Sequence, residues 1–298
     1  MNGSTLAKDN TPDINSFPWR QENMLGRVRT LRGYIQKLTG TASSYFHEQD
    51  NTWSDRNTLG IGMMNISVLD WSKNKGACEG ALDSFSYLSQ MEGGIDESNR
   101  PKVLDFGANS GDFLLLLRAL FPKYDLYGIE LQPYALDMYQ HALANLKEGD
   151  PDPSITELLD QIEQSGVPTI VPGNFFGSNH IQYAEKHGFY EVWGDDLEGI
   201  NEAAEDYGQM SFEKYLSRYP DPYEELGLDI EDFDIIYMYQ FPGNTPVVLD
   251  FLAKNCKPGA KIIVNYSDNK QLDPLYEQYP NLNIDQRFGN QCAILEVN

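Results

Sequence analysis

The pattern of apolar and polar positions changes near Pro101. Beyond this residue, short apolar runs alternate with stretches in which apolar residues recur every three or four positions. The short runs predict buried strands, and the periodic stretches predict amphipathic helices. Strands that alternate with helices are typical of a parallel sheet covered by helices. We therefore predict an α/β domain over 101–298.

Proline and glycine mark most element boundaries in this domain. One helix ends before Pro122, a second begins at Pro133 in its first turn, and a third ends at Pro258-Gly259. The last two strands are joined by Phe288-Gly289-Asn290, a hairpin-type turn. We predict strands at 102–106, 126–130, 233–239, 260–266, 282–287 and 292–297, and helices at 112–120, from 133 and from 246.

One further strand has two candidate positions. Thr169–Val171 precedes a Pro-Gly-Asn-Phe-Phe turn, and Phe189–Trp193 precedes Gly-Asp-Asp. We favour the first because it lies nearer to the preceding helix. In that case 180–232 is an insertion, whereas the second position would make 149–186 the insertion.

The first hundred residues follow a different pattern. A polar arm over 1–20 precedes a basic amphipathic helix at 24–38, and a second helix is expected at 80–91. The residues from Glu92 to Arg100 read as a linker. We accordingly predict a division into 1–100 and 101–298.

The charge balance narrows the possible partners. The 298 residues include 22 basic and 45 acidic side chains, giving a net charge of −23. Such a chain is repelled by nucleic-acid phosphates and by anionic membrane surfaces. We expect no nucleic acid and no membrane as partner. The acidic side chains are concentrated within 147–232, which is compatible with a neutral or cationic ligand.

Cysteine usage and apolar run length give further expectations. Cys78, Cys256 and Cys292 are odd in number and far apart, so they indicate neither a disulfide framework nor a metal site. No apolar run reaches the roughly 20 residues of a membrane span. The N-terminus lacks the apolar stretch of a secretory signal. We predict a soluble cytoplasmic protein without a metal.

The loop after the first predicted strand carries the clearest chemical signal. It reads Asp105-x-Gly107-x-Asn109-x-Gly111 and opens into a helix. Glycines let the backbone pass close to a ligand, and a helix N-terminus offers free N–H groups. The spacing differs from that of a dinucleotide-binding loop, and no Gly-Lys-Ser/Thr of a P-loop follows. Glu130 ends the next strand, where a carboxylate beside such a loop can accept both hydroxyls of a ribose.

The segment VLDFGANSGDF, followed by LYGIELQP, resembles motif I and its sequel in the class I, seven-strand S-adenosylmethionine-dependent methyltransferases. The resemblance covers 101–298. It implies a doubly wound, mostly parallel seven-stranded sheet with an antiparallel C-terminal strand, and S-adenosyl-L-methionine as cofactor. Asn109 stands where the family usually has a glycine, but Asn tolerates left-handed backbone better than other non-glycine residues.

The resemblance also implies roles for the loop residues. Gly107, Asn109 and Gly111 would line the amino-acid end of the cofactor. Asp105 would orient the loop or meet the ammonium group through water. Glu130 would bind the ribose hydroxyls.

At the adenine end, the resemblance implies that Leu131 packs on the base and that Asn174 and Phe175 flank it. Asn174 stands where the family often has an Asp that faces the adenine amino group. Asp195 is the rival position if the third strand is misplaced.

Two residues are catalytic candidates. Tyr239 ends the fourth predicted strand, where the methyl acceptor usually lies in the family. Tyr45-Phe46-His47 resembles the segments that small-molecule members fold over cofactor and acceptor, so 1–100 and 180–232 are expected to form a cap and a lid. His47 is the candidate base because histidine exchanges a proton near neutral pH. A structural or surface role for His47 stays open.

These observations predict a methyltransferase that acts on a small molecule, neutral or cationic. Two alternatives stay open. The Asn174-Phe175-Phe176 segment and the YMYQFPG turn resemble the seven-strand histone-lysine enzymes, which suggests a protein substrate. The chain could also be a non-catalytic, cofactor-binding partner subunit. The sequence does not predict the oligomeric state.

Overall fold

The computed structural model describes residues 24, 26–35, 37–38, 75–130, 133–148, 151–178, 180, 221–239, 245–265, 272–288 and 292–298. His47, Leu131 and Asp195, together with the alternative strand position at 189–193, lie outside these residues.

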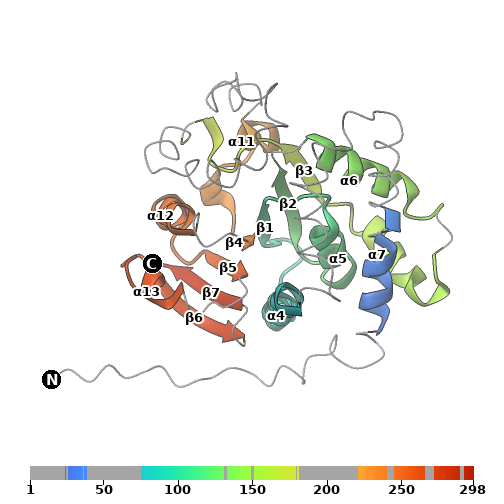
Figure 1. Cartoon of the computed structure of the whole chain (residues 1–298), viewed down its shortest axis with the longest axis horizontal. Coiled ribbons are helices and arrows are strands. Elements are labelled where there is room, and N and C mark those ends of the chain that lie inside the picture. Colours follow the sequence, from blue (N-terminus) through green and yellow to red (C-terminus); the bar gives the residue numbers. More distant parts are fainter. Residues whose placement is uncertain are drawn as a thin grey trace, which may run out of the picture.

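A seven-stranded sheet forms the centre of the molecule (Figure 1). Its order is β3-β2-β1-β4-β5-β7-β6, with parallel pairing from β3 to β5 and antiparallel pairing of β7 with both β5 and β6. The predicted doubly wound, mostly parallel sheet with an antiparallel C-terminal strand is confirmed. The strands are β1 (Lys102–Phe106), β2 (Asp125–Glu130), β3 (Thr169–Pro172), β4 (Ile235–Tyr239), β5 (Lys261–Asn265), β6 (Leu282–Phe288) and β7 (Cys292–Val297).

The favoured position of the third strand is confirmed. β3 pairs in parallel with β2, from Tyr127 opposite Thr169 to Glu130 opposite Pro172. The carboxyl end of β3 therefore lies beside Glu130, and the turn that follows begins at the same edge of the sheet.

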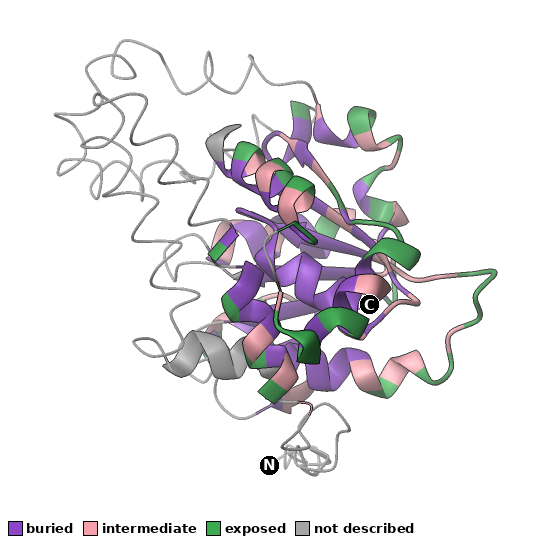
Figure 2. Cartoon of the chain, turned by 90° about the vertical axis from the view of Figure 1, so that its right-hand side faces the viewer, coloured by how far each residue is buried: buried purple, intermediate pink, exposed green. Residues whose placement is uncertain are grey.

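Helices cover both faces of the sheet, and each face buries its own apolar cluster. Figure 2 shows the buried strands enclosed between these layers. The first face carries α4 (Lys75–Glu92), α5 (Asp112–Leu120), α6 (Pro133–Asn145), the short η4 (Pro153–Ile155) and α7 (Thr156–Gln164). The second carries α11 (Pro222–Leu226), η6 (Ile230–Asp232), α12 (Thr245–Asn255) and α13 (Asp273–Tyr276).

The predicted N-terminal helix packs into the first of these layers. Leu31 and Ile35 are fully buried in its apolar cluster. The Arg27 guanidinium donates to the Glu157 carboxylate of α7 at 2.9 Å, and the Tyr34 hydroxyl donates to the Leu146 carbonyl at 2.8 Å. Helical residues 26–35 and 37–38 thus share a core with the α/β domain.

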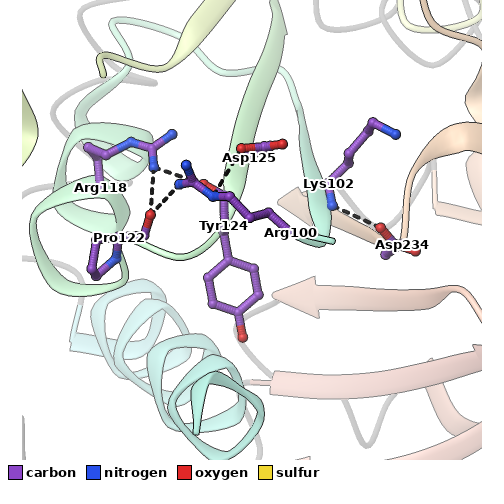
Figure 3. Close-up of polar contacts among 7 residues, drawn as sticks. All are labelled: Arg100, Lys102, Arg118, Pro122, Tyr124, Asp125 and Asp234. Atoms are coloured by element: carbon purple, nitrogen blue, oxygen red, sulfur yellow. Dashed lines mark hydrogen bonds and ion pairs between the residues drawn. The ribbon is translucent and has the colours of Figure 1, made fainter. Parts of the chain in front are cut away.

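Two arginines form hydrogen bonds at the edge of the sheet where its parallel strands begin (Figure 3). Arg100 and Arg118 both donate to the backbone carbonyls of Pro122 and Tyr124, and Arg100 also pairs with Asp125. Burial, with the neighbouring positive charge of Arg100, lowers the pKa of Arg118 to about 10. These bonds fix the start of β2. Ligands of open α/β sheets bind at the opposite edge, where the parallel strands have their carboxyl ends.

Among the helices that the structure describes, none has the length and apolar character needed to cross a membrane.

Candidate functional site

The loop between β1 and α5 turns through three residues with left-handed backbone. Gly107, Asn109 and Gly111 have φ values of 84°, 51° and 73°. The N–H groups of Gly107 and Ala108 donate to the carbonyl of Ile129 in β2, at 3.0 and 3.1 Å. Asn109 thus takes the conformation expected of the glycine that it replaces, and the loop is tied to the neighbouring strand.

Asn109 supports its own conformation, which gives a testable prediction. Its Oδ1 accepts the N–H of Ser110 at 2.7 Å. Asn109→Ala loses this bond and places a less tolerant residue in left-handed backbone, so we expect a loss of about 1–2 kcal/mol in the free energy of unfolding. Asn109→Gly loses the same bond but accepts this φ without strain, so its loss should be smaller, at about 0.5–1 kcal/mol. Urea unfolding of both variants checks this, and equal stabilities would contradict it.

The two glycines of the loop face different surroundings. A Cβ on Gly111 would lie 2.4 Å from the ring of Tyr139 and 2.8 Å from the side chain of Ile170. A Cβ on Gly107 would have no heavy atom of the described residues within 4 Å. The loop is therefore packed against the protein at Gly111 and open at Gly107, where a ligand can approach the backbone.

Glu130 lies directly beside this loop. It is the last residue of β2, is 8% exposed, and its Oε2 accepts the N–H of Asn109 at 2.7 Å. A carboxylate offers about four acceptor positions, so it can accept several hydrogen bonds at once. The acidic residue and the glycine loop thus occupy the relative positions that the sequence suggested.

A second buried carboxylate lies next to Glu130. Asp105 in β1 is opposite Gly128 of β2 and Tyr237 of β4. Burial, and then the negative charge of Glu130, raise the pKa of Asp105 well above its ordinary value. A cationic ligand bound beside these two carboxyl groups would favour the ionised form of Asp105 and so lower its pKa again.

The raised pKa of Asp105 predicts a pH dependence of stability. Because its folded pKa lies above its unfolded pKa, Asp105 favours folding most at low pH, and this contribution declines as pH rises through the folded pKa. As pH rises above the unfolded pKa of about 3.9, the ligand-free protein should lose stability relative to Asp105→Asn, by at most about 1.4 kcal/mol per pH unit. Urea unfolding of both proteins at several pH values tests this, and parallel pH profiles would contradict it.

The start of α5 contains polar residues that the sequence analysis did not select. The Ser110 hydroxyl donates to Asp112 Oδ1 at 2.9 Å. Burial raises the pKa of Asp112 to about 6, opposed by this hydrogen bond and by the positive charge of Arg32 from the N-terminal helix. A Ser-x-Asp pair at a helix start is a recognisable N-terminal signal. The effect of Arg32 on the pKa of Asp112 could not be predicted from the local sequence, because Arg32 lies in a segment that is distant along the chain.

An aromatic contact joins the turn after β3 to the residue that precedes the glycine loop. Asn174 Oδ1 accepts the N–H of Phe176 at 3.0 Å, which closes the turn. The ring of Phe175 stacks on Phe106, the last residue of β1, with centroids 4.6 Å apart and planes 14° apart. Phe106 was not among the predicted site residues, although it directly precedes Gly107. This stack connects the predicted adenine-flanking turn to the glycine loop.

The predicted acceptor side lies at the ends of β4 and β5. Tyr239 is the last residue of β4 and is opposite Asn265 in β5. Two residues earlier, Tyr237 stacks on Phe113 of α5 with centroids 3.8 Å apart. Tyr237 therefore packs in the helix layer, while the backbone of Tyr239 reaches the carboxyl edge of the sheet.

A cavity of about 260 Å³ lies on the outer side of the turn, between Phe176 and α11. His180, Asp229 and Asp232 contribute to its lining, and no residue of the glycine loop does. It is thus separate from the site formed by the loop and Glu130.

No protein-family model matches the chain. No curated protein matches it either.

Several solved structures are similar to the chain. One is a precorrin-6y C5,15-methyltransferase from Geobacter metallireducens, with 12% identity, a TM-score of 0.35, and coverage of 73% of this chain and 87% of that chain. Another is the rRNA methyltransferase aviRa from Streptomyces viridochromogenes, with 14% identity, a TM-score of 0.40, and coverage of 73% and 84%. A third is an RNA methyltransferase from Salinibacter ruber, with 12% identity, a TM-score of 0.34, and coverage of 71% and 89%. The fold assignment rests on the strand order of the chain itself.

Proposed function

We propose that the chain is an S-adenosylmethionine-dependent methyltransferase. The observation that carries this proposal is the left-handed Gly107-x-Asn109-x-Gly111 loop, held by Glu130 at the carboxyl edge of the sheet. This edge lies where the strand order reverses, between β1 and β4, and open α/β sheets bind ligands at such a point. The loop sequence departs from both the dinucleotide and the P-loop patterns, which favours a single nucleoside cofactor.

The site residues fit this cofactor in charge and in shape. The open space at Gly107 admits a ligand against the backbone, and the buried Asp105 and Glu130 favour a positively charged one. When bound, S-adenosylmethionine would supply a methyl group on a positively charged sulfur. In this proposal Gly107, Asn109 and Gly111 line its amino-acid end, and Asp105 orients the loop.

In this proposal the remaining roles are those that the sequence resemblance implies. Glu130 accepts hydrogen bonds from the ribose hydroxyls, and Leu131, Asn174 and Phe175 surround the adenine. Tyr239, at the end of β4, lies on the acceptor side. His47 is proposed as the base that takes the acceptor's proton. Alignment of the reacting groups supplies most of the rate in such a site, and proton removal adds to it.

We further propose a small-molecule acceptor, neutral or cationic. The net charge of −23 supports this choice, because an acidic surface disfavours nucleic acid. The predicted cap over 1–100 and lid over about 180–232 would enclose such an acceptor. A basic protein substrate is the second candidate, since the same charge would attract it.

Calorimetry with S-adenosylmethionine and S-adenosylhomocysteine tests the cofactor assignment. We expect each ligand to bind at one site per chain. If neither ligand binds, the proposal is overturned. Release of S-adenosylhomocysteine is then measured with phenols, carboxylic acids, amines and a histone mixture. Turnover with a small acceptor supports the proposed substrate class, and turnover with histone alone replaces it by the protein class. Cofactor binding without turnover in any arm would favour a non-catalytic partner subunit.

A further inference from the structure

Helix α11 holds the turn after β3 from its outer side. The Tyr223 hydroxyl donates to the backbone carbonyl of Phe175 at 2.5 Å. Tyr223 is 8% exposed and belongs to the apolar cluster of the second face. The carbonyl of Phe175 is thus fixed by a buried side chain that comes from a distant part of the sequence.

Asp221 fixes Tyr223 and the end of the turn together. As N-cap of α11, its Oδ1 accepts the N–H of Tyr223 at 2.9 Å. Its Oδ2 accepts both the backbone N–H of Ser178, at 2.6 Å, and the Ser178 hydroxyl. Burial opposes ionisation of Asp221, but the hydrogen bonds from Ser178 and Tyr223 lower its pKa. The carboxylate is therefore charged at neutral pH, and hydrogen bonds to a charged acceptor are strong.

Phe175 is consequently held at two points. Its carbonyl is bonded to α11, and its ring is stacked on Phe106 at the end of β1. The first contact ties the turn to α11, and the second ties it to the end of β1. Loss of the first contact leaves the ring stack and the bond from the Phe176 N–H to Asn174 Oδ1, but removes the tie between the backbone of Phe175 and α11.

We propose that Tyr223 is a positioning residue that sets the turn at 174–176 for recognition of the adenine base. The inference rests on the proposed function, in which Asn174 and Phe175 flank the base. Tyr223 touches neither base nor methyl group in this arrangement. It acts through the backbone of Phe175, with Asp221 as the residue that orients it.

The test compares two ligands that differ along one edge of the base. S-adenosylhomocysteine carries a 6-amino group and an unprotonated N1, and S-inosylhomocysteine carries a 6-oxo group and a proton on N1. Tyr223→Phe removes one hydroxyl from a buried ring. We expect it to weaken S-adenosylhomocysteine binding about five- to tenfold, as for loss of one hydrogen bond, and to weaken S-inosylhomocysteine about twofold or less. The preference for adenine therefore falls, which a general loss of stability would not cause.

Tyr279→Phe is the matched control. The Tyr279 hydroxyl donates to the Pro246 carbonyl at 2.8 Å, and its ring packs on the same apolar cluster. This variant loses an equivalent bond away from the turn, so both affinities should stay within about twofold of the parent protein. Asp221→Asn keeps an oxygen acceptor without the charge and should reduce the adenine preference about two- to threefold. Thermal melting establishes that each variant is folded.

The outcomes separate the inference from the proposed function. If the parent protein binds neither ligand, the proposed function fails. If the parent protein binds S-adenosylhomocysteine and Tyr223→Phe keeps both its affinity and its adenine preference, only the inference fails. A parent protein without preference between the two ligands would also overturn it, as would an equal loss of preference in Tyr279→Phe. If Tyr223→Phe does not fold, an unchanged preference in Asp221→Asn overturns the inference.

Discussion

Replacement of Glu130 by alanine is expected to weaken the binding of S-adenosylhomocysteine by at least about 100-fold. Two losses combine in this variant. The N–H of Asn109 loses its acceptor at 2.7 Å, so the loop loses one of its ties to β2, and the ribose hydroxyls lose the carboxylate proposed to receive them. Hydrogen bonds to a charged group contribute about 1.5–3 kcal/mol each, so two of them give the expected magnitude. Calorimetry of the folded variant measures it.

Two further variants control this experiment. Glu130→Gln keeps an oxygen acceptor for the loop but lacks the charge, so its affinity should fall between those of the parent protein and Glu130→Ala. Glu97→Ala changes an exposed acidic side chain in the loop between α4 and β1 and should leave the affinity unchanged. An affinity of Glu130→Ala within twofold of the parent protein would show that the ligand lies elsewhere.

Alanine at Gly107 should mainly weaken cofactor binding, whereas alanine at Gly111 should mainly destabilise the fold. At Gly111 the new Cβ would meet the Tyr139 ring at 2.4 Å, and φ is 73°, so we expect a loss of about 3 kcal/mol or more in the free energy of unfolding. At Gly107, none of the residues that the structure describes has a heavy atom within 4 Å of the new Cβ, so the φ of 84° is the main cost, at about 1–2 kcal/mol. The Gly107→Ala protein should fold but lose cofactor binding, because its Cβ occupies the space left for the ligand.

Urea unfolding and calorimetry on the same preparations separate the two effects. For Gly107→Ala the decisive result is a folded protein whose affinity for S-adenosylhomocysteine has fallen at least about tenfold, since the added methyl group would displace the ligand. Unchanged affinity would mean that the open side of the loop does not face the cofactor. For Gly111→Ala, a stability equal to that of the parent protein would mean that Tyr139 moves aside without cost.

The elements with clear boundary signals could be predicted from the sequence. The helix predicted at 112–120 is α5, because Gly111 takes left-handed backbone before it and Pro122 follows it. The strand favoured at Thr169–Val171 is β3 with one additional residue. Boundaries without such a signal differ between the prediction and the structure. The helix predicted at 80–91 begins at Lys75, and Gly76 and Gly80 weaken the helical pattern over this first part of it.

The candidate site could be predicted only where its residues share a local motif. Asp105, Gly107, Asn109 and Gly111 lie in one loop, and Glu130 follows from the geometry of neighbouring parallel strands. The contacts made by Phe106, Arg32 and Tyr223 could not be predicted in this way. Each joins segments that are distant in the sequence, and the packing of side chains across such segments leaves no periodic pattern in either of them.

The hydrogen bonds between Ser178 and Asp221 join the two residues that flank the stretch 179–220. These two residues therefore meet at one point on the domain surface. For a connection with fixed ends, closure entropy changes slowly with length, and a doubling costs only about 0.6 kcal/mol. The junction is thus a natural place for graft and deletion variants that test what the stretch contributes.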